Sequence, residues 1–234
     1  MADLNFSVLL ITAPPPGAGA LGGEGNGAFV KIDGREALLR SAELFLNREN
    51  VKQIQVAFLP DDVEEAKRKH GGHFGFSGIK VVTGGPRWID QWAAAKISAE
   101  ATHVIVHDAA RPAVPYSDIE ALMAEAEGHS AVALAAPLRS PLVELDEGGS
   151  PMAFHPASAF MQILMPQVYS VARFKEVVAT KREVHASQIK LLKGSGLNIR
   201  VGGSGDAGLA KAMISMLPKP KAKPLNNPFE EAQW

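Results

Sequence analysis

The stretch Val104-Ile105-Val106-His107-Asp108-Ala109-Ala110-Arg111-Pro112 decides the fold of this chain. Its β-branched beginning, bounded by polar residues, is typical of a fully buried strand in a parallel sheet. The strand is expected to stop at Asp108 and Arg111, because Pro112 fixes the backbone just beyond them. Ligands of open α/β sheets bind at the carboxyl ends of strands, where a carboxylate can hold a metal ion and a guanidinium a phosphate. The stretch therefore predicts a nucleotide or sugar-phosphate site; the alternative is a local ion pair that closes the strand.

Predicted strands and helices alternate on both sides of this stretch. Short apolar runs predict strands over residues 6–12, 54–59, 79–82, 131–136 and 198–201. Helical periodicity and capping signals predict helices over residues 36–47, 60–69, 88–99, 171–181, 186–193 and 207–217, and a further helix from a Ser-x-x-Glu capping box at Ser117. This alternation predicts an α/β fold built on a three-layer, doubly wound, mostly parallel sheet.

The chain is expected to form a single domain over residues 1–217 with two appendages. Residues 138–154 alternate weakly around Glu147-Gly148-Gly149-Ser150, which predicts a projecting β-hairpin arm. Residues 218–234 are rich in Pro and Lys and predict an extended tail. At 234 residues, the chain is long enough for one sizeable α/β domain and short for two.

The composition excludes several classes of protein. With 24 basic and 25 acidic side chains, the chain has a net charge near zero, which argues against nucleic acid or an anionic membrane as its main partner. It has no cysteine, so disulfides and thiolate metal sites are excluded. No apolar run approaches the ~20 residues of a membrane helix, and the first residues lack the positive charge of a signal peptide. We expect a soluble cytoplasmic protein.

A glycine-rich loop follows the first predicted strand. Gly17-Ala18-Gly19-Ala20-Leu21-Gly22 satisfies the GxGxxG pattern of dinucleotide-binding folds. In those folds the third glycine opens a helix, but here Gly23-Glu24-Gly25-Asn26-Gly27 follows, and each glycine costs a helix about 1 kcal/mol. The loop also lacks the Gly-Lys-Ser/Thr of a P-loop. The pattern therefore predicts neither a dehydrogenase nor a P-loop enzyme.

Two pairs of histidines are candidates for metal ligands. His103 and His107 lie on one side of the predicted strand, and His70 and His73 flank glycines in an expected loop. Zinc sites need three or four ligands, and no third ligand is placed near either pair. Solvated or hydrogen-bonded histidines are predicted instead, with His107 orienting Asp108 or its loop.

The run Val106 to Pro112 resembles the signature of the 2-C-methyl-D-erythritol 4-phosphate cytidylyltransferases, enzymes of the non-mevalonate isoprenoid pathway with a nucleotide-diphospho-sugar transferase-like fold. The resemblance extends weakly from about Val8 to about Leu217, which identifies the chain as a divergent member. Gly84-Gly85 is similar to the glycine pair before the family's cytosine-reading helix, and Arg87 to the arginine that follows it. The serine expected next is replaced by Asp90 or Gln91.

The resemblance implies a cytidylyltransferase that joins CTP to a sugar or polyol phosphate, releases pyrophosphate and uses Mg²⁺. It implies that Asp108 and Arg111 are catalytic, with Asp108 as the metal ligand. Arg111 would bind the acceptor phosphate together with Lys211, a shifted equivalent of the lysine in the family's Ile-Lys-Val-Thr strand. The nucleotide would be lined by Ala13, Gly17, Gly19, Gly84, Gly85, Arg87 and His107.

The family's arm swaps between two subunits, so the resemblance also implies a homodimer through residues 138–154. Where the family places a substrate-binding arginine, this chain has Pro156-Ala157-Ser158. Dimerisation through the arm is therefore expected without that substrate contact; the alternative is a plain surface hairpin in a monomer.

Charge in the first loop separates two functional hypotheses. Residues 1–30 contain no Lys or Arg, Asn26-Gly27 stands where the family has Pro-Lys, and Pro14-Pro15-Pro16 lack three N–H donors. Cytidylyl transfer brings a phosphate dianion against a triphosphate, and loss of one charge-stabilising donor typically costs about 10²- to 10³-fold in rate. The chain is therefore expected to be either a cytidylyltransferase or a catalytically degenerate homologue that acts as a binding or regulatory protein.

Overall fold

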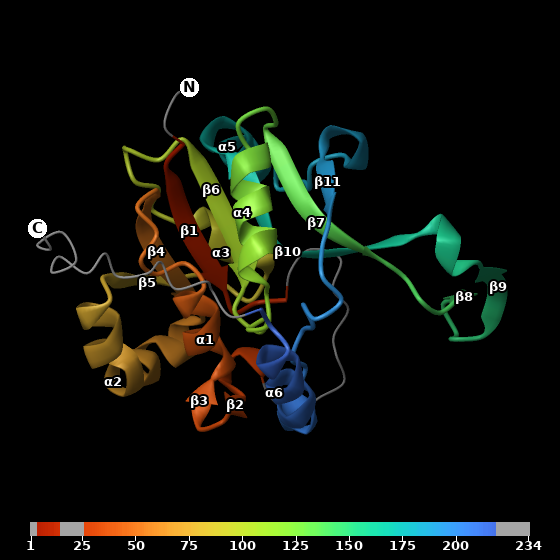
Figure 1. Ribbon diagram of the computed structural model, residues 1–234, viewed down its shortest axis with the longest axis horizontal. Coiled ribbons are helices and arrows are strands. Elements are labelled where there is room, and N and C mark those ends of the chain that lie inside the picture. Colours follow the sequence, from red (N-terminus) through yellow and green to blue (C-terminus); the bar gives the residue numbers. More distant parts are fainter. Residues whose placement is uncertain (1–3, 15–25, 219–234) are drawn as a thin grey trace, which may run out of the picture.

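The computed structural model describes residues 4–14 and 26–218, and a mixed sheet forms the centre of this part (Figure 1). Its seven strands lie in the order β11-β7-β10-β6-β1-β4-β5. They are β1 Phe6–Ile11, β4 Val51–Phe58, β5 Ile79–Thr83, β6 His103–Asp108, β7 Ala131–Pro137, β10 Met161–Ser170 and β11 Lys190–Lys193. Only β10 runs antiparallel to its neighbours, β6 and β7, in the described sheet. The predicted mostly parallel α/β sheet is confirmed.

Helices cover both faces of the sheet, which gives three layers. They are α1 Ala37–Glu43, α2 Pro60–Phe76, α3 Trp88–Ala93, α4 Tyr116–Glu125, α5 Val171–Thr180 and α6 Ala207–Ser215. Side chains alternate along β1, so Val8 and Leu10 pack with α1, α2 and α4, whereas Leu9 and Ile11 pack with α3 and α5. Both faces of the strand are fully buried, which is why it lacks a polar face in the sequence.

Strand β10 was missed by the sequence analysis. Proline removes a ladder hydrogen bond and is uncommon in a central strand, yet Pro166 lies within β10. The structure accommodates it at an irregularity, where the register with β7 shifts between Leu164 and Gln167 and the Met165–Pro166 peptide is cis. The strand therefore continues on both sides of the proline and lies between β6 and β7.

Several predicted boundaries and one predicted helix were wrong. The helix expected over residues 186–193 is a single 3₁₀ turn, Ala186–Gln188, followed by β11. Residues 198–201 form no strand of the described sheet, although the Val201 N–H donates to the Ala110 carbonyl at 2.8 Å. Helix α3 stops at Ala93, and α4 begins after Pro115 without a side-chain cap from Ser117.

Helix α2 runs past its predicted end at residue 69 to Phe76, so His70 and His73 lie in a helix and not in a loop. Its buried residues Val63, Ala66, His70 and Phe74 are spaced three or four apart, which is one helical stripe. Burial of this stripe outweighs the unfavourable helix propensity of the glycines between residues 71 and 75.

The predicted hairpin is present as β8, Leu142–Leu145, paired antiparallel with β9, Pro151–His155. Figure 1 shows it projecting from the end of the main sheet, beyond β7 and β10. A smaller two-stranded sheet, β2 Lys31–Ile32 with β3 Arg35–Glu36, lies before α1. Of the predicted tail, residues 219–234 lie outside the described residues, as do Gly17 and Gly19. Among the described helices, none has the length and apolarity to cross a membrane.

Two glycines test how closely the chain packs. A Cβ at Gly27 would lie 1.8 Å from the Val201 carbonyl oxygen, whereas a Cβ at Gly72 of α2 would meet nothing within 4 Å. Gly27→Ala should therefore lower the free energy of unfolding by about 2 kcal/mol or more. Gly72→Ala should raise it by about 0.5 kcal/mol, because alanine restricts the unfolded chain and favours helix. Urea unfolding measures both, and equal effects of the two substitutions would contradict the packing at Gly27.

Candidate functional site

The carboxyl ends of β1 and β6 meet at the point where the strand order reverses. The chain passes from β1 to β4 and β5 on one side and then returns to β6 on the other. Such a switch point is where open α/β sheets bind ligands. The register pairs Ile11 with Asp108, and the Ala109 N–H donates to the Ile11 carbonyl at 2.9 Å. Thr12 and Ala13 therefore lie at the same end of the sheet as Asp108.

The Asp108 carboxylate is buried and bonded on both oxygens. Its Oδ1 accepts the Ala110 N–H at 2.9 Å, and its Oδ2 accepts Arg200 Nε at 2.6 Å. Arg111 Nε lies 3.8 Å from the same Oδ2. Asp108 and Arg111 thus form a local ion pair, the arrangement that the sequence analysis gave as its alternative, and Arg200 joins them. We call these three residues the Asp108 triad.

Arg200 was missed because the family's lysine was sought at Lys211. Lys211 lies on α6, where its Nζ is 2.7 Å from Asp33 Oδ1 on an exposed surface, and it is not a partner of Asp108. The sequence held a better signal in Ile199-Arg200-Val201, which matches Ile-Lys-Val with arginine in place of lysine. The arginine that contacts Asp108 is therefore Arg200, and the expected role of Lys211 beside Arg111 is wrong.

Arg111 is anchored by a hydrogen bond at one nitrogen, and its Nε faces Asp108 without forming one. One terminal guanidinium nitrogen, Nη1, donates to the Asn198 carbonyl oxygen at 2.8 Å. Within the described part of the chain, Arg111 Nε and Asn198 Oδ1 are buried without a hydrogen-bond partner. Burial lowers the pKa of the Arg111 guanidinium. The negative charge of Asp108 raises this pKa, and the positive charge of Arg200 lowers it further. Two guanidiniums beside one carboxylate leave a net positive charge, which suits an anionic ligand.

Asp108 does not fit the predicted metal site. Its exposed fraction is 1 %, and both oxygens already accept hydrogen bonds. Among residues 4–14 and 26–218, no group of three His, Asp or Glu side chains is placed to hold a metal ion. A magnesium ion would need several oxygen ligands in octahedral geometry, and this arrangement offers none that is free.

His107 supports the loop from inside the core. Its side chain is completely buried, and its ring lies 5.4 Å from that of Phe45 in an edge-on arrangement. Nε2 lies 3.0 Å from the Arg111 carbonyl oxygen, so the neutral ring donates its N–H there. The predicted direct contact of His107 with a nucleotide is not available to a side chain in this position. Its bond instead holds the backbone between Asp108 and Arg111.

At the end of β1, the backbone N–H groups donate hydrogen bonds to the side chain of Gln91. Its Oε1 accepts the N–H groups of Thr12 at 2.9 Å and Ala13 at 3.1 Å, and its Nε2 donates to Thr12 Oγ1 at 3.2 Å. Gln91 is completely buried on α3. A Cβ at Gly84 would lie 2.7 Å from Gln91 Cα, so this glycine permits the close approach of α3. The sequence analysis named Gln91 only as a possible replacement for a serine.

The remaining predicted nucleotide-binding residues lie near α3 or outside the described residues. Arg87 forms two hydrogen bonds with Asp90, at 2.9 and 2.7 Å, on the surface of α3. The hydrogen bond to Asp90 raises the pKa of Arg87 and lowers that of Asp90. A Cβ at Gly85 would lie 2.8 Å from an Asp90 carboxylate oxygen, so this glycine also makes room for α3. Gly17 and Gly19 are outside the described residues.

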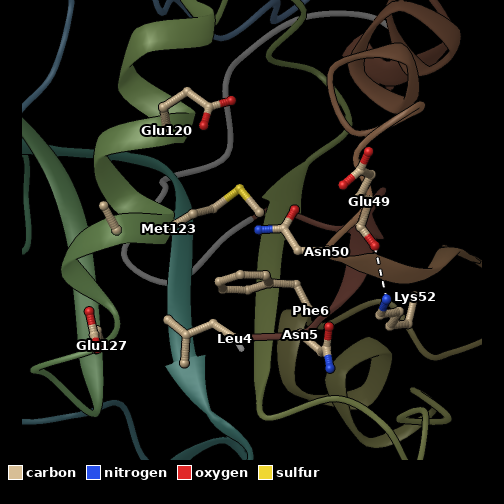
Figure 2. Close-up of a pocket in the computed structure, with 10 residues that line it drawn as sticks. Leu4, Asn5, Phe6, Glu49, Asn50, Lys52, Glu120, Met123 and Glu127 are labelled. Atoms are coloured by element: carbon tan, nitrogen blue, oxygen red, sulfur yellow. Dashed lines mark hydrogen bonds between the residues drawn. The ribbon is translucent and has the colours of Figure 1, made fainter. Parts of the chain in front are cut away.

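A pocket of about 520 Å³ lies at the opposite end of the sheet (Figure 2). It is lined by residues at the amino ends of β1 and β4 and by α4, and Lys52 Nζ in it donates to the Glu49 carbonyl at 2.9 Å. Glu49, Glu120 and Glu127 make its rim acidic, which disfavours a phosphorylated ligand. The carboxyl-end site is therefore the better candidate for phosphate chemistry.

Comparison with known proteins gives a consistent family match. The family model described as IspD, 2-C-methyl-D-erythritol 4-phosphate cytidylyltransferase, matches residues 8–215. A protein of that description from Shewanella loihica is 27% identical over 177 residues, which cover 73% of this chain and 72% of the relative. One from Rhodopirellula baltica is 26% identical over 231 residues, which cover 88% of this chain and 94% of the relative.

Solved structures share the fold. A crystal structure of 4-diphosphocytidyl-2C-methyl-D-erythritol synthase superposes with a TM-score of 0.70 at 20% identity, covering 90% of this chain and 99% of that one. The 2-C-methyl-D-erythritol 4-phosphate cytidylyltransferase from Thermus thermophilus gives a TM-score of 0.65 at 23% identity, with coverage of 91% and 100%. The three-layer α/β fold of this chain is thus shared with solved structures.

The burial of His107 predicts a pH dependence of stability. Burial lowers the pKa of His107 to about 3, whereas a histidine in an unfolded chain has a pKa of about 6.5. The unfolded state therefore binds more protons between these values, and stability is lost as the pH falls below about 6.5. His107→Gln should remove about 1.4 kcal/mol of the stability difference between pH 7.5 and 5.5. Urea unfolding at the two pH values measures it.

The exposed His129→Gln is the control and should retain the wild-type pH dependence. An unchanged pH dependence in His107→Gln would contradict the burial of a neutral imidazole.

Proposed function

Because this chain belongs to the 2-C-methyl-D-erythritol 4-phosphate cytidylyltransferase family, we propose that its carboxyl-end site binds CTP and a polyol phosphate and transfers the cytidylyl group slowly. The observation that carries the proposal is the Asp108 triad, which holds two arginines at the switch point of the sheet. The proposed acceptor is 2-C-methyl-D-erythritol 4-phosphate, as in the names of the relatives.

The proposed reaction needs positive charge more than it needs acid or base. A phosphate oxygen of the acceptor attacks the α-phosphorus of CTP, the new P–O bond forms, and the bond to the β-phosphate breaks with release of pyrophosphate. Phosphoryl and nucleotidyl transfers depend on positioning and on stabilising charge on the phosphate oxygens. Arg111 and Arg200 are the cations proposed to do so, with Asp108 holding the two guanidiniums in place.

The proposed rate is low because other cations are missing from the sequence. Residues 1–30 carry no Lys or Arg, so the loop after β1 offers no positive side chain to the triphosphate. Among the described residues no three His, Asp or Glu side chains gather to hold a metal ion, and we propose that Mg²⁺ enters bound to the triphosphate. CTP is an intracellular nucleotide, and we therefore propose that the protein acts in the cytoplasm.

A second candidate function is binding or regulation without turnover. This second function is favoured because both oxygens of the Asp108 carboxylate already accept hydrogen bonds, from Ala110 and Arg200. The carboxylate must lose one of these bonds before it can contact a ligand. In this case the chain would retain affinity for CTP or for the acceptor phosphate and release no pyrophosphate.

A pyrophosphate-release assay with CTP, Mg²⁺ and 2-C-methyl-D-erythritol 4-phosphate tests the proposal. We expect turnover at least about a hundredfold below the common enzyme value of ~10 s⁻¹. Arg111→Ala should abolish acceptor binding in calorimetric titration, because the buried guanidinium is the proposed phosphate ligand. Arg68→Ala, at an exposed position of α2, is the control and should leave turnover and binding unchanged.

Turnover near the common enzyme value would contradict the proposed weakness. Binding of CTP without pyrophosphate release would favour the regulatory function, and acceptor affinity unchanged in Arg111→Ala would remove the role of that arginine.

We further propose that two copies associate through the β8–β9 hairpin. An isolated two-stranded hairpin is marginally stable in water, and exposed apolar patches mark protein interfaces. The hairpin and the adjoining start of β10 expose large apolar side chains, namely Leu142, Val143, Leu145, Met152, Phe154, Phe160, Met161 and Ile163. A second copy would cover these side chains and stabilise the arm.

Sedimentation velocity over a range of protein concentrations tests the dimer. Phe154 is 77% exposed on the arm, so Phe154→Asp should shift the dimer to monomer by placing a charge in the interface. Phe76→Asp is the matched control, because Phe76 is 95% exposed at the end of α2, away from the arm. A wild-type protein that stays monomeric would contradict the proposal.

A further inference from the structure

We infer that Gln91 closes the part of the nucleotide site where the base would bind, so that this chain holds nucleotides by their phosphates with little preference for the base. The inference rests on the proposed function, because it assumes a nucleotide at the carboxyl ends of β1 and β6. It concerns specificity, since Gln91 is not placed against the reacting phosphates.

The polar groups at the end of β1 are already paired. Both the Thr12 and Ala13 N–H groups donate to Gln91 Oε1, at 2.9 and 3.1 Å. The Thr12 hydroxyl accepts Gln91 Nε2 at 3.2 Å and donates to the Ala57 carbonyl at 2.8 Å. The next residue, Pro14, has no N–H to offer. A ligand that approached this strand end would find its first two N–H donors occupied and no third.

The chemistry of the carboxamide makes it a substitute for a base edge. A glutamine side chain presents a carbonyl acceptor beside an NH₂ donor. Cytosine presents the same pair, an acceptor at ring N3 beside the exocyclic amino donor. The Gln91 carboxamide therefore supplies the Thr12 and Ala13 donors with the acceptor that a pyrimidine would otherwise bring.

The position of Gln91 is fixed from several sides. The residue is completely buried, and its backbone is packed so closely on Gly84 that a Cβ there would lie 2.7 Å from Gln91 Cα. If the carboxamide moved away, two buried N–H groups would lose their acceptor, which is unfavourable unless a ligand replaces it at once. A base must therefore compete with an acceptor that is covalently part of the chain.

Replacing Gln91 should open the base position. In Gln91→Ser the short side chain no longer reaches Thr12 and Ala13, and their N–H groups become available to cytosine. A regained hydrogen bond corresponds to about a tenfold gain in affinity, so two of them should let CTP bind Gln91→Ser about ten- to a hundredfold more tightly than it binds the wild type. Uracil carries a ring N–H where cytosine has an acceptor, so UTP should gain less.

The experiment is a calorimetric titration of CTP, UTP and inorganic tripolyphosphate, each with Mg²⁺, into three full-length proteins. The wild type should bind CTP and UTP within about threefold of each other. Gln91→Ser should gain affinity for CTP and keep that for tripolyphosphate. The control is Gln55→Ser, which also removes a completely buried glutamine, one whose Oε1 accepts the Lys96 N–H at 2.8 Å. The control should behave as the wild type.

Two outcomes overturn the inference alone: a wild type that prefers CTP over UTP by about tenfold, or a folded Gln91→Ser that binds tripolyphosphate with unchanged CTP affinity. If none of the proteins binds a nucleotide or tripolyphosphate, the proposed function fails together with the inference. Should Gln91→Ser not fold, hydrogen exchange in the wild type decides. The Thr12 and Ala13 amides should be protected without ligand and gain nothing from CTP, and a large gain would overturn the inference.

Discussion

The burial of one carboxylate, that of Asp108, is the constraint on which the arrangement of this site depends. A charge removed from water is unfavourable unless it is paired and hydrogen-bonded, so Asp108 requires Arg200, Arg111 and the Ala110 N–H together. Arg200 comes from a segment far along the chain, and this segment is fixed beside the loop by the bond from Val201 to Ala110. The neutral ring of His107 also holds this loop, through its hydrogen bond to the Arg111 carbonyl. One ionic requirement thus positions the end of β6 and the segment after β11.

The same charges define what the site can do. Two guanidiniums around one carboxylate leave a positive excess for a phosphate. This arrangement compensates only in part for a first loop without Lys or Arg. Because Arg200 and Arg111 are bound to Asp108, a phosphate must share them with an internal anion. Because Asp108 and the phosphate compete for the same two arginines, we expect weak binding and slow transfer. A loop dedicated to binding a triphosphate would bind it more tightly.

The sequence predicted the parts of the fold in which local pattern and tertiary environment agree. The apolar runs of β1 and β6 are buried on both faces, and the Asp108–Arg111 spacing led us to expect a site at the end of β6, where the strand order reverses. Strand β10 was missed because Pro166 contradicts local propensity, and only the neighbouring strands show how an irregularity absorbs it. Arg200 and Gln91 were missed as site residues because each acts through partners more than 70 positions away, Asp108 and Thr12, and no periodicity encodes such a contact.

Arg200 and Gln91 share a property that explains why they are hard to find and how they act. Each satisfies a group at a strand end that a ligand would otherwise satisfy, Arg200 the Asp108 carboxylate and Gln91 the N–H groups of Thr12 and Ala13. These groups are stable without a ligand, because the Asp108 carboxylate and the N–H groups of Thr12 and Ala13 each already have a hydrogen-bond partner. Every new contact at these groups then requires an existing one to break. Affinity is therefore governed by exchange of partners, and the phosphates, which can use the positive excess, are favoured over the base, which meets only neutral groups already bonded.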